Sequence, residues 1–345
     1  MSAPILLAVL AAVALLSWAA TGGVLRLLKA WNVFDQPNHR SSHQRATPRG
    51  GGLAVVSVIA LVWIGGALAY GLQPAGFWPL LCGLALLVAV SWLDDLRSQP
   101  ARLRLGVQVA AVALALWGAG SQALVFQGLL PPLADHLIVA LAWLWFINLF
   151  NFMDGIDGIS AVECISVAGG LALCAAVAGF GPGYVFLAAS LAAAALGFLV
   201  WNWAPARIFL GDVGSVPLGF LVGWLLILLA AEGQWAAALI LPLYYLADAS
   251  WTLSRRILRR EALWKGHRNH FYQKAVRRGL SHAAVSTRIL LCNLVLVALA
   301  LVAVLGQPWP ALAAACLAVA VLLIMLIGKG LPARDGEAPG DHEAR

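Results

Sequence analysis

Long runs of apolar residues alternate with short polar stretches along the chain, and the lengths of these runs predict its elements. A helix needs roughly 20 mainly apolar residues to cross the hydrocarbon core of a bilayer. The sequence contains no series of short alternating segments of the kind that builds a transmembrane β-barrel. The pattern therefore predicts an all-α fold, a polytopic membrane helix bundle with about 11 transmembrane helices. The predicted spans lie near residues 3–28, 52–71, 77–93, 104–121, 137–150, 160–180, 184–203, 215–231, 235–252, 286–305 and 309–328.

Composition excludes a soluble domain. Of the 345 residues, 62% are hydrophobic and 11% are charged, whereas about a quarter of the residues in a soluble protein are charged. Residues 1–20 carry no basic residue ahead of their long apolar run, so they predict an uncleaved anchor rather than a secretory signal. We expect a single integral membrane domain over 1–330 and a polar, disordered cytoplasmic tail over 331–345.

The distribution of charge predicts the orientation. If the N-terminus lies outside, all 22 Lys and Arg residues fall on or near the cytoplasmic side. The opposite loops then carry Asp135, His136 and Glu232 as their only charged or titratable groups. This is the positive-inside pattern. The net charge of +7 therefore indicates a surface that faces anionic lipid, not a nucleic-acid-binding protein.

Acidic motifs lie at the cytoplasmic ends of predicted helices. Asp94 and Asp95 close the third span, and because adjacent carboxylates repel each other, they favour a nearby cation, either Arg97 or a metal ion. A solvated helix end would contain the same pair. Asp212 lies in "FLGDVGS", whose glycines would let the backbone approach a phosphate, although a turn followed by an N-cap has the same composition.

The stretch "NLFNFMDGIDGIS" (148–160) places two amides and two acids at intervals of three in very apolar surroundings. Asn148, Asn151, Asp154 and Asp157 share one face only if the helix breaks at Gly155. "DGIDG" resembles half of a calcium-binding loop, but the glutamate of an EF-hand is missing. Such residues are best tolerated at the water-facing mouth of a bundle, next to a cation.

Two basic loops complete the set of polar motifs. "HRSSHQRATPRGGG" (39–52) is suited to contacting phosphate or shaping a lid, and "HRNHFYQK" (267–274) lies in a strongly basic loop that favours an anionic ligand. We expect Arg255 to Arg260 to contact lipid headgroups instead. Clustered carboxylates and an amide can hold Mg²⁺, which usually keeps substrate phosphates in its shell. Together with a membrane bundle, these motifs indicate phosphoryl transfer to a lipid-borne substrate at the cytoplasmic interface.

In this order and spacing, the motifs resemble those of the polyprenyl-phosphate N-acetylhexosamine-1-phosphate transferases, the MraY/WecA-like glycosyltransferase family 4. The resemblance covers nearly all of the chain and rests on "DD", "NxxNxxDGxDG", "FxGDxGS" and the late basic loop together. "HRNHFYQK" departs from the three-histidine motif of the MraY branch. It looks more like the WbpL-type branch, which initiates O-antigen.

The resemblance implies roles for the acidic residues. Asp212 matches the family's Mg²⁺ ligand, with Asn151 nearby at the metal and the diphosphate, and with Mn²⁺ as a substitute metal. Asp94 and Asp95 match an essential acidic pair, one member of which is proposed as a catalytic base.

Further roles follow from the same resemblance. Asp154 and Asp157 match catalytic positions at the nucleotide and the diphosphate, and Phe209 is expected to stack on the uracil. The basic loops supply the remaining candidates, which are His267 and His270 near the sugar or its phosphate, and Arg40, Arg49 and Arg268 at the anionic ligand.

The reaction implied is transfer of N-acetylhexosamine-1-phosphate from a UDP-sugar to undecaprenyl phosphate, with release of UMP. The partners would be UDP-N-acetylhexosamine, undecaprenyl phosphate and membrane lipid, in a multi-pass protein of the bacterial inner (plasma) membrane. Whether the protein forms a homodimer stays open. Because a phosphate monoester has a second pKa near ~6, the lipid phosphate is mostly a dianion at neutral pH, and Asp94 or Asp95 need not remove a proton.

Two alternatives stay open. One is the muramyl-pentapeptide phosphotransferase of peptidoglycan synthesis. The other is a non-enzymatic membrane transporter, which would need polar residues in the middle of the bilayer. Asp248, Glu163 and Asn293 are the candidates for such positions.

Overall fold

The computed structural model describes residues 2–36, 46–261 and 268–328. Predictions for Arg40, for His267 and for the tail 331–345 therefore lie outside the described residues. The α-helices are α1 (Ala3–Ala30), α2 (Gly52–Tyr70), α3 (Phe77–Leu96), α4 (Ala101–Ala119), α5 (Pro132–Met153), α6 (Ile159–Val177), α7 (Pro182–Asn202), α8 (Asp212–Leu229), α9 (Trp235–Ile240), α10 (Leu243–Leu258), α11 (Phe271–Arg277), α12 (His282–Val304) and α13 (Pro308–Ile327). Shorter elements are a 3₁₀ helix at Gly120–Ala123 (η1), a π-helical turn at Ala230–Gln234 (η2) and the strands β1 (Phe34–Asp35) and β2 (Thr47–Pro48).

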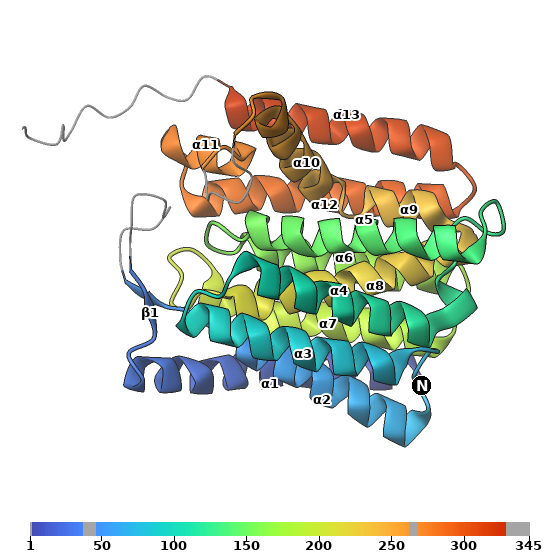
Figure 1. Ribbon diagram of the computed structural model, residues 1–345, viewed down its shortest axis with the longest axis horizontal. Helices are drawn as coiled ribbons and strands as arrows, with labels where there is room; N and C mark the ends of the chain where they lie inside the picture. The colour runs from blue at the N-terminus through green and yellow to red at the C-terminus, as the bar shows by residue number, and fades with distance from the viewer. Residues whose placement is uncertain (1, 37–45, 262–267, 329–345) are drawn as a thin grey trace, which may run out of the picture.

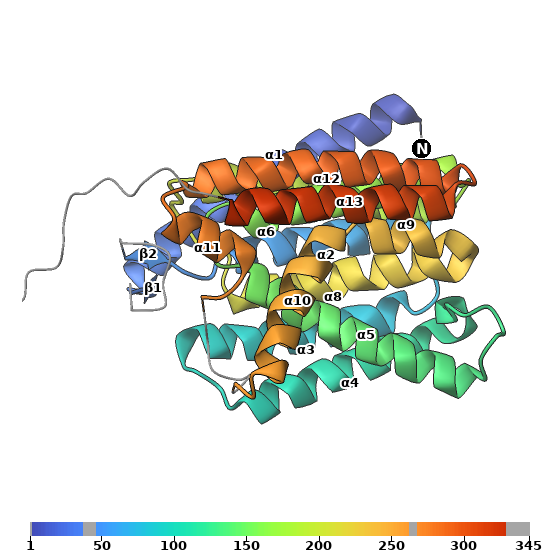
Figure 2. The same cartoon turned by 90° about the horizontal axis from the view of Figure 1, so that it is seen from above.

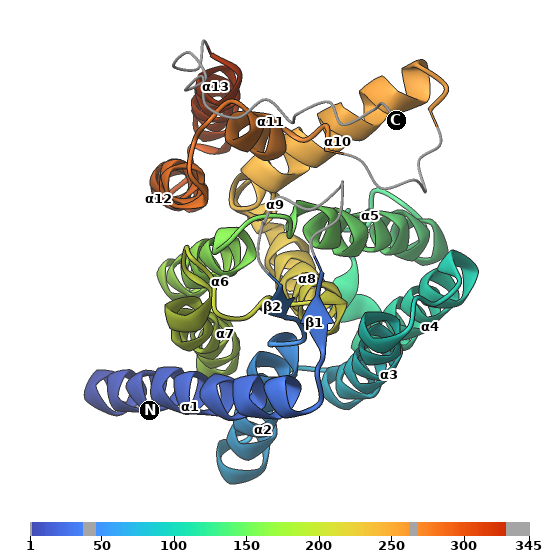
Figure 3. The same cartoon turned by 90° about the vertical axis from the view of Figure 1, so that its left-hand side faces the viewer.

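The long helices lie side by side along the long axis of the molecule (Figure 1). α8 runs through the centre, and in the end-on view of Figure 3 it is surrounded by other helices; it contacts α2, α3, α5 and α6. Its side chains from Val213 to Leu226 are all buried. A helix that is apolar on every side belongs in the core of a bundle. The prediction of an all-α, polytopic bundle is confirmed.

Ten helices among the described residues are long and apolar enough to cross a membrane. The predicted span at 235–252 differs, because it is divided between α9 and α10 at Leu241 and Pro242. Proline lacks an N–H group and its ring clashes with the preceding turn, so it interrupts a helix. The chain starts at one end of the bundle and α13 ends at the other (Figure 1), which requires an odd number of passes. The broken α9–α10 segment makes the remaining passage along the bundle, and α10 is not among the ten apolar helices.

α10 differs from the other helices in direction as well as in sequence. Figure 2 shows it crossing the bundle at a steep angle, and in Figure 3 its C-terminal end projects away from the neighbouring helices. It carries Asp248, Arg255 and Arg256, of which Asp248 and Arg256 are buried, while Trp251 is exposed.

One end of the bundle gathers β1, β2, α11 and the polar connections (Figure 1). β1 pairs antiparallel with β2, and residues 48–52 continue alongside the segment before α8. There the Gly51 N–H donates to the Phe209 carbonyl at 2.9 Å, and the Gly52 N–H donates to the Leu210 carbonyl at 2.8 Å. A Cβ at Gly52 would overlap the backbone of Gly214, so only glycine allows this approach. This pairing brings Arg49 beside Asp212.

Candidate active site

Asp95, at the end of α3, holds the N-terminus of α8. Its Oδ1 accepts from the Asp212 N–H and its Oδ2 from the Val213 N–H, each at 3.0 Å. The first N–H groups of a helix have no partner within the helix, and a carboxylate both bonds them and suits the positive end of the helix dipole. Gly211 has a φ of +76°, and a Cβ there would lie 2.5 Å from Asp95 Oδ2. The glycine is therefore required for the contact.

Asp212, the first residue of α8, lies between two arginines and an amide. Its Oδ1 accepts from Arg49 Nη2 at 2.7 Å and from Asn151 Nδ2 at 3.2 Å, and its Oδ2 lies 3.5 Å from Arg104 Nη1. Asn151 Nδ2 also donates to Ser215 Oγ at 2.8 Å. The end of α5 and the start of α8 are thus joined at the carboxylate for which the family resemblance implies the role of metal ligand.

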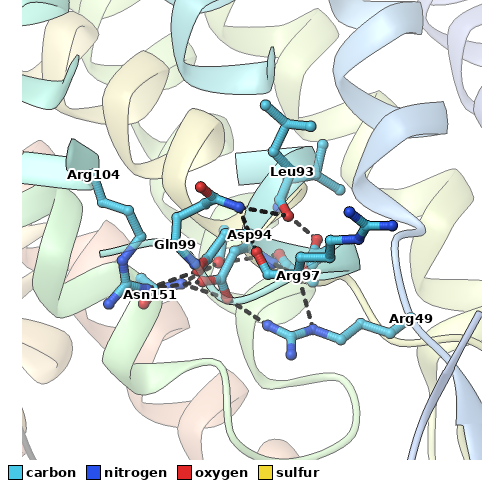
Figure 4. A network of polar contacts seen from close by, with 12 residues as sticks. Arg49, Leu93, Asp94, Arg97, Gln99, Arg104 and Asn151 are labelled. Atoms are coloured by element: carbon cyan, nitrogen blue, oxygen red, sulfur yellow. Dashed lines mark hydrogen bonds and ion pairs between the residues drawn. The ribbon is translucent and has the colours of Figure 1, made fainter. Parts of the chain in front are cut away.

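Asp94 lies on the other side of Arg104. Its Oδ2 pairs with Arg104 Nη1 at 2.8 Å, and its Oδ1 accepts from the Gln99 N–H at 2.6 Å. Arg104 Nη1 therefore contacts both Asp94 Oδ2 and, at 3.5 Å, Asp212 Oδ2. Figure 4 shows Arg104, Asn151 and Arg49 converging on these acidic groups.

Arg49 joins two of the acids. Its Nε pairs with Asp95 Oδ1 at 2.8 Å while its Nη2 bonds Asp212. Burial by itself would lower the pKa of Arg49, but the Asp212 and Asp95 carboxylates outweigh burial and raise the pKa above its ordinary value. The Arg49 guanidinium therefore stays charged. The cluster contains three carboxyl groups and two guanidiniums.

The loop after α5 brings Asp154 close to the cluster. Burial raises the pKa of Asp154 to about 7, and the charges of Asp212 and Asp95 add to this effect, while Ser160 and Arg49 oppose it. The helix ends at Met153, ahead of Gly155. Asn151 and Asp154 can share one site only if the helix breaks in this region.

Asp157 joins three segments of the chain. Its Oδ2 accepts from the Ala206 N–H at 3.0 Å, and its Oδ1 lies 3.1 Å from His282 Nδ1 at the start of α12. Its carbonyl accepts from Ser286 Oγ at 2.8 Å. Both carboxylate oxygens therefore contact other parts of the protein, an arrangement that positions the loop.

His270 lies at the start of α11 and is 2% exposed. Its Nδ1 lies 3.1 Å from Asp248 Oδ1, and Asp248 also accepts from the Phe271 N–H at 3.1 Å. Asp248 thus caps α11 from α10. Tyr272 of α11 in turn donates to the Phe152 carbonyl at 3.1 Å. These contacts connect α10, α11 and the end of α5. They also hold His270 in place at the start of α11.

The other predicted residues lie at the edges of this site. Phe209 is half-buried, and its backbone pairs with the segment that carries Arg49. Arg268 is half-buried just before α11. Asn148 contacts α4 and not α8, because its Nδ2 donates to Gln108 Oε1 at 2.8 Å.

Sequence reasoning did not single out Arg104, His282 or Asn202. Arg104 is the cation beside Asp94, whereas Arg97 forms no ion pair with any described residue. The turn at Pro100 between α3 and α4 was the available signal, since a tight helical hairpin brings the end of one helix to the start of the next. Asn202 bonds the Gly158 N–H at 3.0 Å and the Ile208 carbonyl at 2.9 Å, a contact that no local pattern indicates.

The sequence is similar to those of several known proteins. Residues 77–230 match the model of glycosyl transferase family 4. A probable undecaprenyl-phosphate N-acetylglucosaminyl 1-phosphate transferase of Bacillus subtilis is 30% identical over 275 residues, which cover 75% of this chain and 74% of that protein. The chain belongs to glycosyl transferase family 4.

Other relatives carry two kinds of name. A phospho-N-acetylmuramoyl-pentapeptide-transferase of Mycolicibacterium gilvum is 32% identical over 237 residues, 55% of this chain and 65% of that protein. A decaprenyl-phosphate N-acetylglucosaminephosphotransferase of Mycolicibacterium smegmatis is 30% identical over 231 residues, 61% of this chain and 56% of that protein. The chain thus spans less than two thirds of the length of these two relatives.

Family membership confirms the resemblance inferred from the motifs, while the WbpL-type branch stays a prediction. The region matched by the glycosyl transferase family 4 model contains the acids and amide of the site, and Arg49, Arg268 and His270 lie outside it. Inside the match are Asp94, Asp95, Asn151, Asp154, Asp157, Phe209 and Asp212.

Proposed function

We propose that this protein transfers N-acetylhexosamine-1-phosphate from a UDP-sugar to undecaprenyl phosphate, releases UMP and so starts a lipid-linked surface polysaccharide of O-antigen type. Membership of glycosyl transferase family 4 and the name of the Bacillus subtilis relative support the transfer. The positive-inside charge pattern supports an active site on the cytoplasmic face of a bacterial inner membrane.

One observation carries the proposal. Asp94, Asp95 and Asp212 come from two helices more than a hundred residues apart and meet two arginines at one end of the bundle. Acids and guanidiniums arranged in this way can bind a diphosphate and a divalent cation together. A structural ion-pair network alone would not need Asn151 at the same carboxylate.

The donor set fits Mg²⁺, with Mn²⁺ as a substitute. Mg²⁺ prefers oxygen ligands and is usually bound by one or two carboxylates together with substrate phosphates. Asp94 and Asp212 provide two carboxylates that share a contact with Arg104. Asn151 contacts Asp212 through its Nδ2, and it would offer its amide oxygen to an ion only with the amide group turned. Among the described residues, no group of three His, Cys, Asp or Glu side chains is arranged to hold a metal ion by itself, so substrate phosphates would have to complete the shell. When bound, Mg²⁺ would neutralise charge on the departing UMP.

In the reaction, an oxygen of the lipid phosphate attacks the β-phosphorus of the UDP-sugar. The bond between that phosphorus and the oxygen bridging to the α-phosphate breaks, and its electrons leave with UMP. Arg49 and Arg104, held by Asp95, Asp212 and Asp94, would orient the diphosphate. Asp94 has both oxygens in contacts with Arg104 and the Gln99 N–H, which suits a positioning role better than proton removal.

The test uses membranes that contain the full chain, with Mg²⁺, polyprenyl phosphate and a panel of labelled UDP-N-acetylhexosamines. The expected result is label in the organic phase together with an equal amount of UMP. Asp212→Asn should abolish both products. Absence of product with every donor, from protein that is folded and inserted, would overturn the proposal.

A second candidate is the muramyl-pentapeptide phosphotransferase. It is favoured by relatives of that name, including one of Moorella thermoacetica that is 39% identical over 146 residues, 38% of this chain and 44% of that protein. The same assay separates the two functions when UDP-N-acetylmuramoyl-pentapeptide is included. Activity with that donor alone would replace the polysaccharide proposal.

The transporter alternative receives less support from the buried polar residues. Asp248 caps α11. Glu163 accepts from Asn293 Nδ2 at 2.8 Å between α6 and α12. Both therefore have structural partners, whereas a transport path would more often align such groups through the bundle.

A further inference from the structure

A cavity of about 240 Å³ lies beside α10 and α11, separate from the carboxylate cluster. Seven of its eight lining residues are polar or charged, and its basic groups include residues of both helices. The lining residues are Trp251, Thr252, Arg255, Arg256, Arg259, Glu261, Asn269 and Lys274.

The cavity has an excess of positive charge. Four of its side chains are basic and one is acidic. Arg256 Nε pairs with Glu261 Oε2 at 2.9 Å, which leaves Arg255, Arg259 and Lys274 without an ion pair among the described residues. Three like charges around one cavity repel each other and attract an anion.

Lys274 shows this repulsion most directly. It is half-buried, and its ammonium lies 5.1 Å from the centre of the Phe271 ring. Burial lowers the pKa of Lys274, the charges of Arg255, Arg277 and Arg278 lower it further, and Asp248 opposes them. An anion between Lys274 and Arg255 would offset the repulsion between these basic groups.

The surroundings of the cavity are those of a membrane surface. The flank of α10 exposes Trp251, Ile257 and Leu258, at 63%, 57% and 84% of their full exposure. A helix with apolar and basic faces lies in the boundary between headgroups and acyl chains, and tryptophan is enriched there. α10 projects from the bundle in Figure 3 as such a helix would. An anion that reaches this cavity from the lipid carries apolar chains as well as charge.

We propose that this cavity binds the phosphate headgroup of an anionic phospholipid of the inner leaflet, with Arg255 of α10 and Lys274 of α11 as its main contacts. The lipid would bridge two helices that Asp248 already joins. α11 contacts the end of α5 through Tyr272, so the same lipid would hold α11 against the active-site end of the bundle. The proposal does not depend on which sugar nucleotide the protein uses.

The experiment measures thermal unfolding of the purified full chain in neutral detergent with added phosphatidylglycerol or phosphatidylcholine. We expect phosphatidylglycerol to raise the Tm of the natural protein, and phosphatidylcholine to raise it much less. In the double variant Arg255→Gln/Lys274→Gln, the increment from phosphatidylglycerol should fall by more than half. Native mass spectrometry should show the matching loss of a retained phosphatidylglycerol molecule.

The matched control is Arg26→Gln/Arg102→Gln, which removes the same charge from exposed positions that do not line the cavity. It should keep the full increment. An equal loss in the control would mean general charge attraction and would overturn the proposal. If the double variant does not fold, Arg255→Lys and Arg255→Gln are compared, and the proposal requires lysine to retain more of the increment.

Two further additions identify the source of the phosphate. Inorganic phosphate at millimolar concentration should not reproduce the effect, and if it does so saturably, a soluble anion is the ligand and the lipid proposal is wrong. A UDP-sugar should stabilise the natural protein and the double variant equally. If it stabilises only the natural protein, the cavity belongs to the donor site instead.

Discussion

Asp94, Asp95 and Asp212 are alike in the sequence, but their surroundings differ. Asp95 is fully buried at its side chain and bonds two N–H groups and Arg49. Breaking a buried ion pair costs about 3–5 kcal/mol, because the remaining charge has no partner. We therefore expect Asp95→Asn to lower the Tm by about 5–10 °C in detergent. Asp94 is more solvated, so Asp94→Asn should lower activity and change the Tm little. Equal losses of Tm in the Asp94→Asn and Asp95→Asn variants would contradict the structural role assigned to Asp95.

Asp94 can be tested for proton removal through pH. We expect Asp94→Asn to lower the transfer rate by about 10²-fold, within the range of a lost polar catalytic group, and to do so equally at pH 7 and pH 9. The reason is that the lipid phosphate is already a dianion at pH 7 and that the loss comes from a misplaced Arg104. Initial rates at both pH values check this. Recovery of the variant at pH 9 would instead favour Asp94 as the base.

Arg49 would compete with the proposed divalent ion for Asp212. Its guanidinium bonds Asp212 at 2.7 Å, at the oxygen that also faces Asn151. We expect the Arg49→Gln variant to bind Mn²⁺ about tenfold more tightly, because it removes about 1.4 kcal/mol of charge repulsion. We expect the same variant to transfer sugar phosphate more slowly. Electron paramagnetic resonance of free Mn²⁺ measures the affinity without turnover. Arg207→Gln, an exposed arginine that stacks on Trp201, is the control.

At the scale of elements, the apolar runs predicted most helices closely, and the misses have physical causes. The predicted span 137–150 is shorter than α5, Pro132–Met153, because Asp135 and His136 interrupt the apolar run. Asp135 is in fact buried and accepts from the N–H groups of Val125 and Phe126. The division of 235–252 escaped prediction because its overall hydropathy resembles that of a span, although Pro242 marked the break.

α11 offers a prediction at this scale, because one buried side chain holds it. Asp248 accepts from the N–H groups of Phe271 and Tyr272 and lies beside His270. We expect Asp248→Asn to weaken this cap and to raise hydrogen exchange at Phe271–Arg277 at least tenfold, while exchange in α8 stays unchanged. Glu163→Gln is the matched control, since it alters a buried acid on α6 and should leave α11 protected. Faster exchange throughout the protein would show a global loss of stability instead.

At the scale of the whole molecule, the sequence indicated which acids gather at one end of the bundle better than it indicated how they meet. The motif acids were recognisable because charged residues in apolar surroundings are costly and usually serve a function. Arg104 and His282 were not, because their partners lie on other elements and depend on how helices pack. The pairing of residues 48–52 with the segment before α8 was equally hidden, since it depends on the close approach of Gly52 and Gly214.

The orientation of the bundle is the remaining test of the whole arrangement. The end that carries Arg49, Arg104 and Asp212 should face the cytoplasm, because the opposite connections contain no Lys or Arg. We expect Leu129→Cys, which is 85% exposed at the other end, to react with a membrane-impermeant maleimide on intact cells. Arg207→Cys, in the connection between α7 and α8, should react only after permeabilisation. The natural protein gives the background from its own cysteines. Labelling of Arg207→Cys on intact cells would put the acidic cluster outside, where neither UDP-sugars nor the proposed reaction would be found.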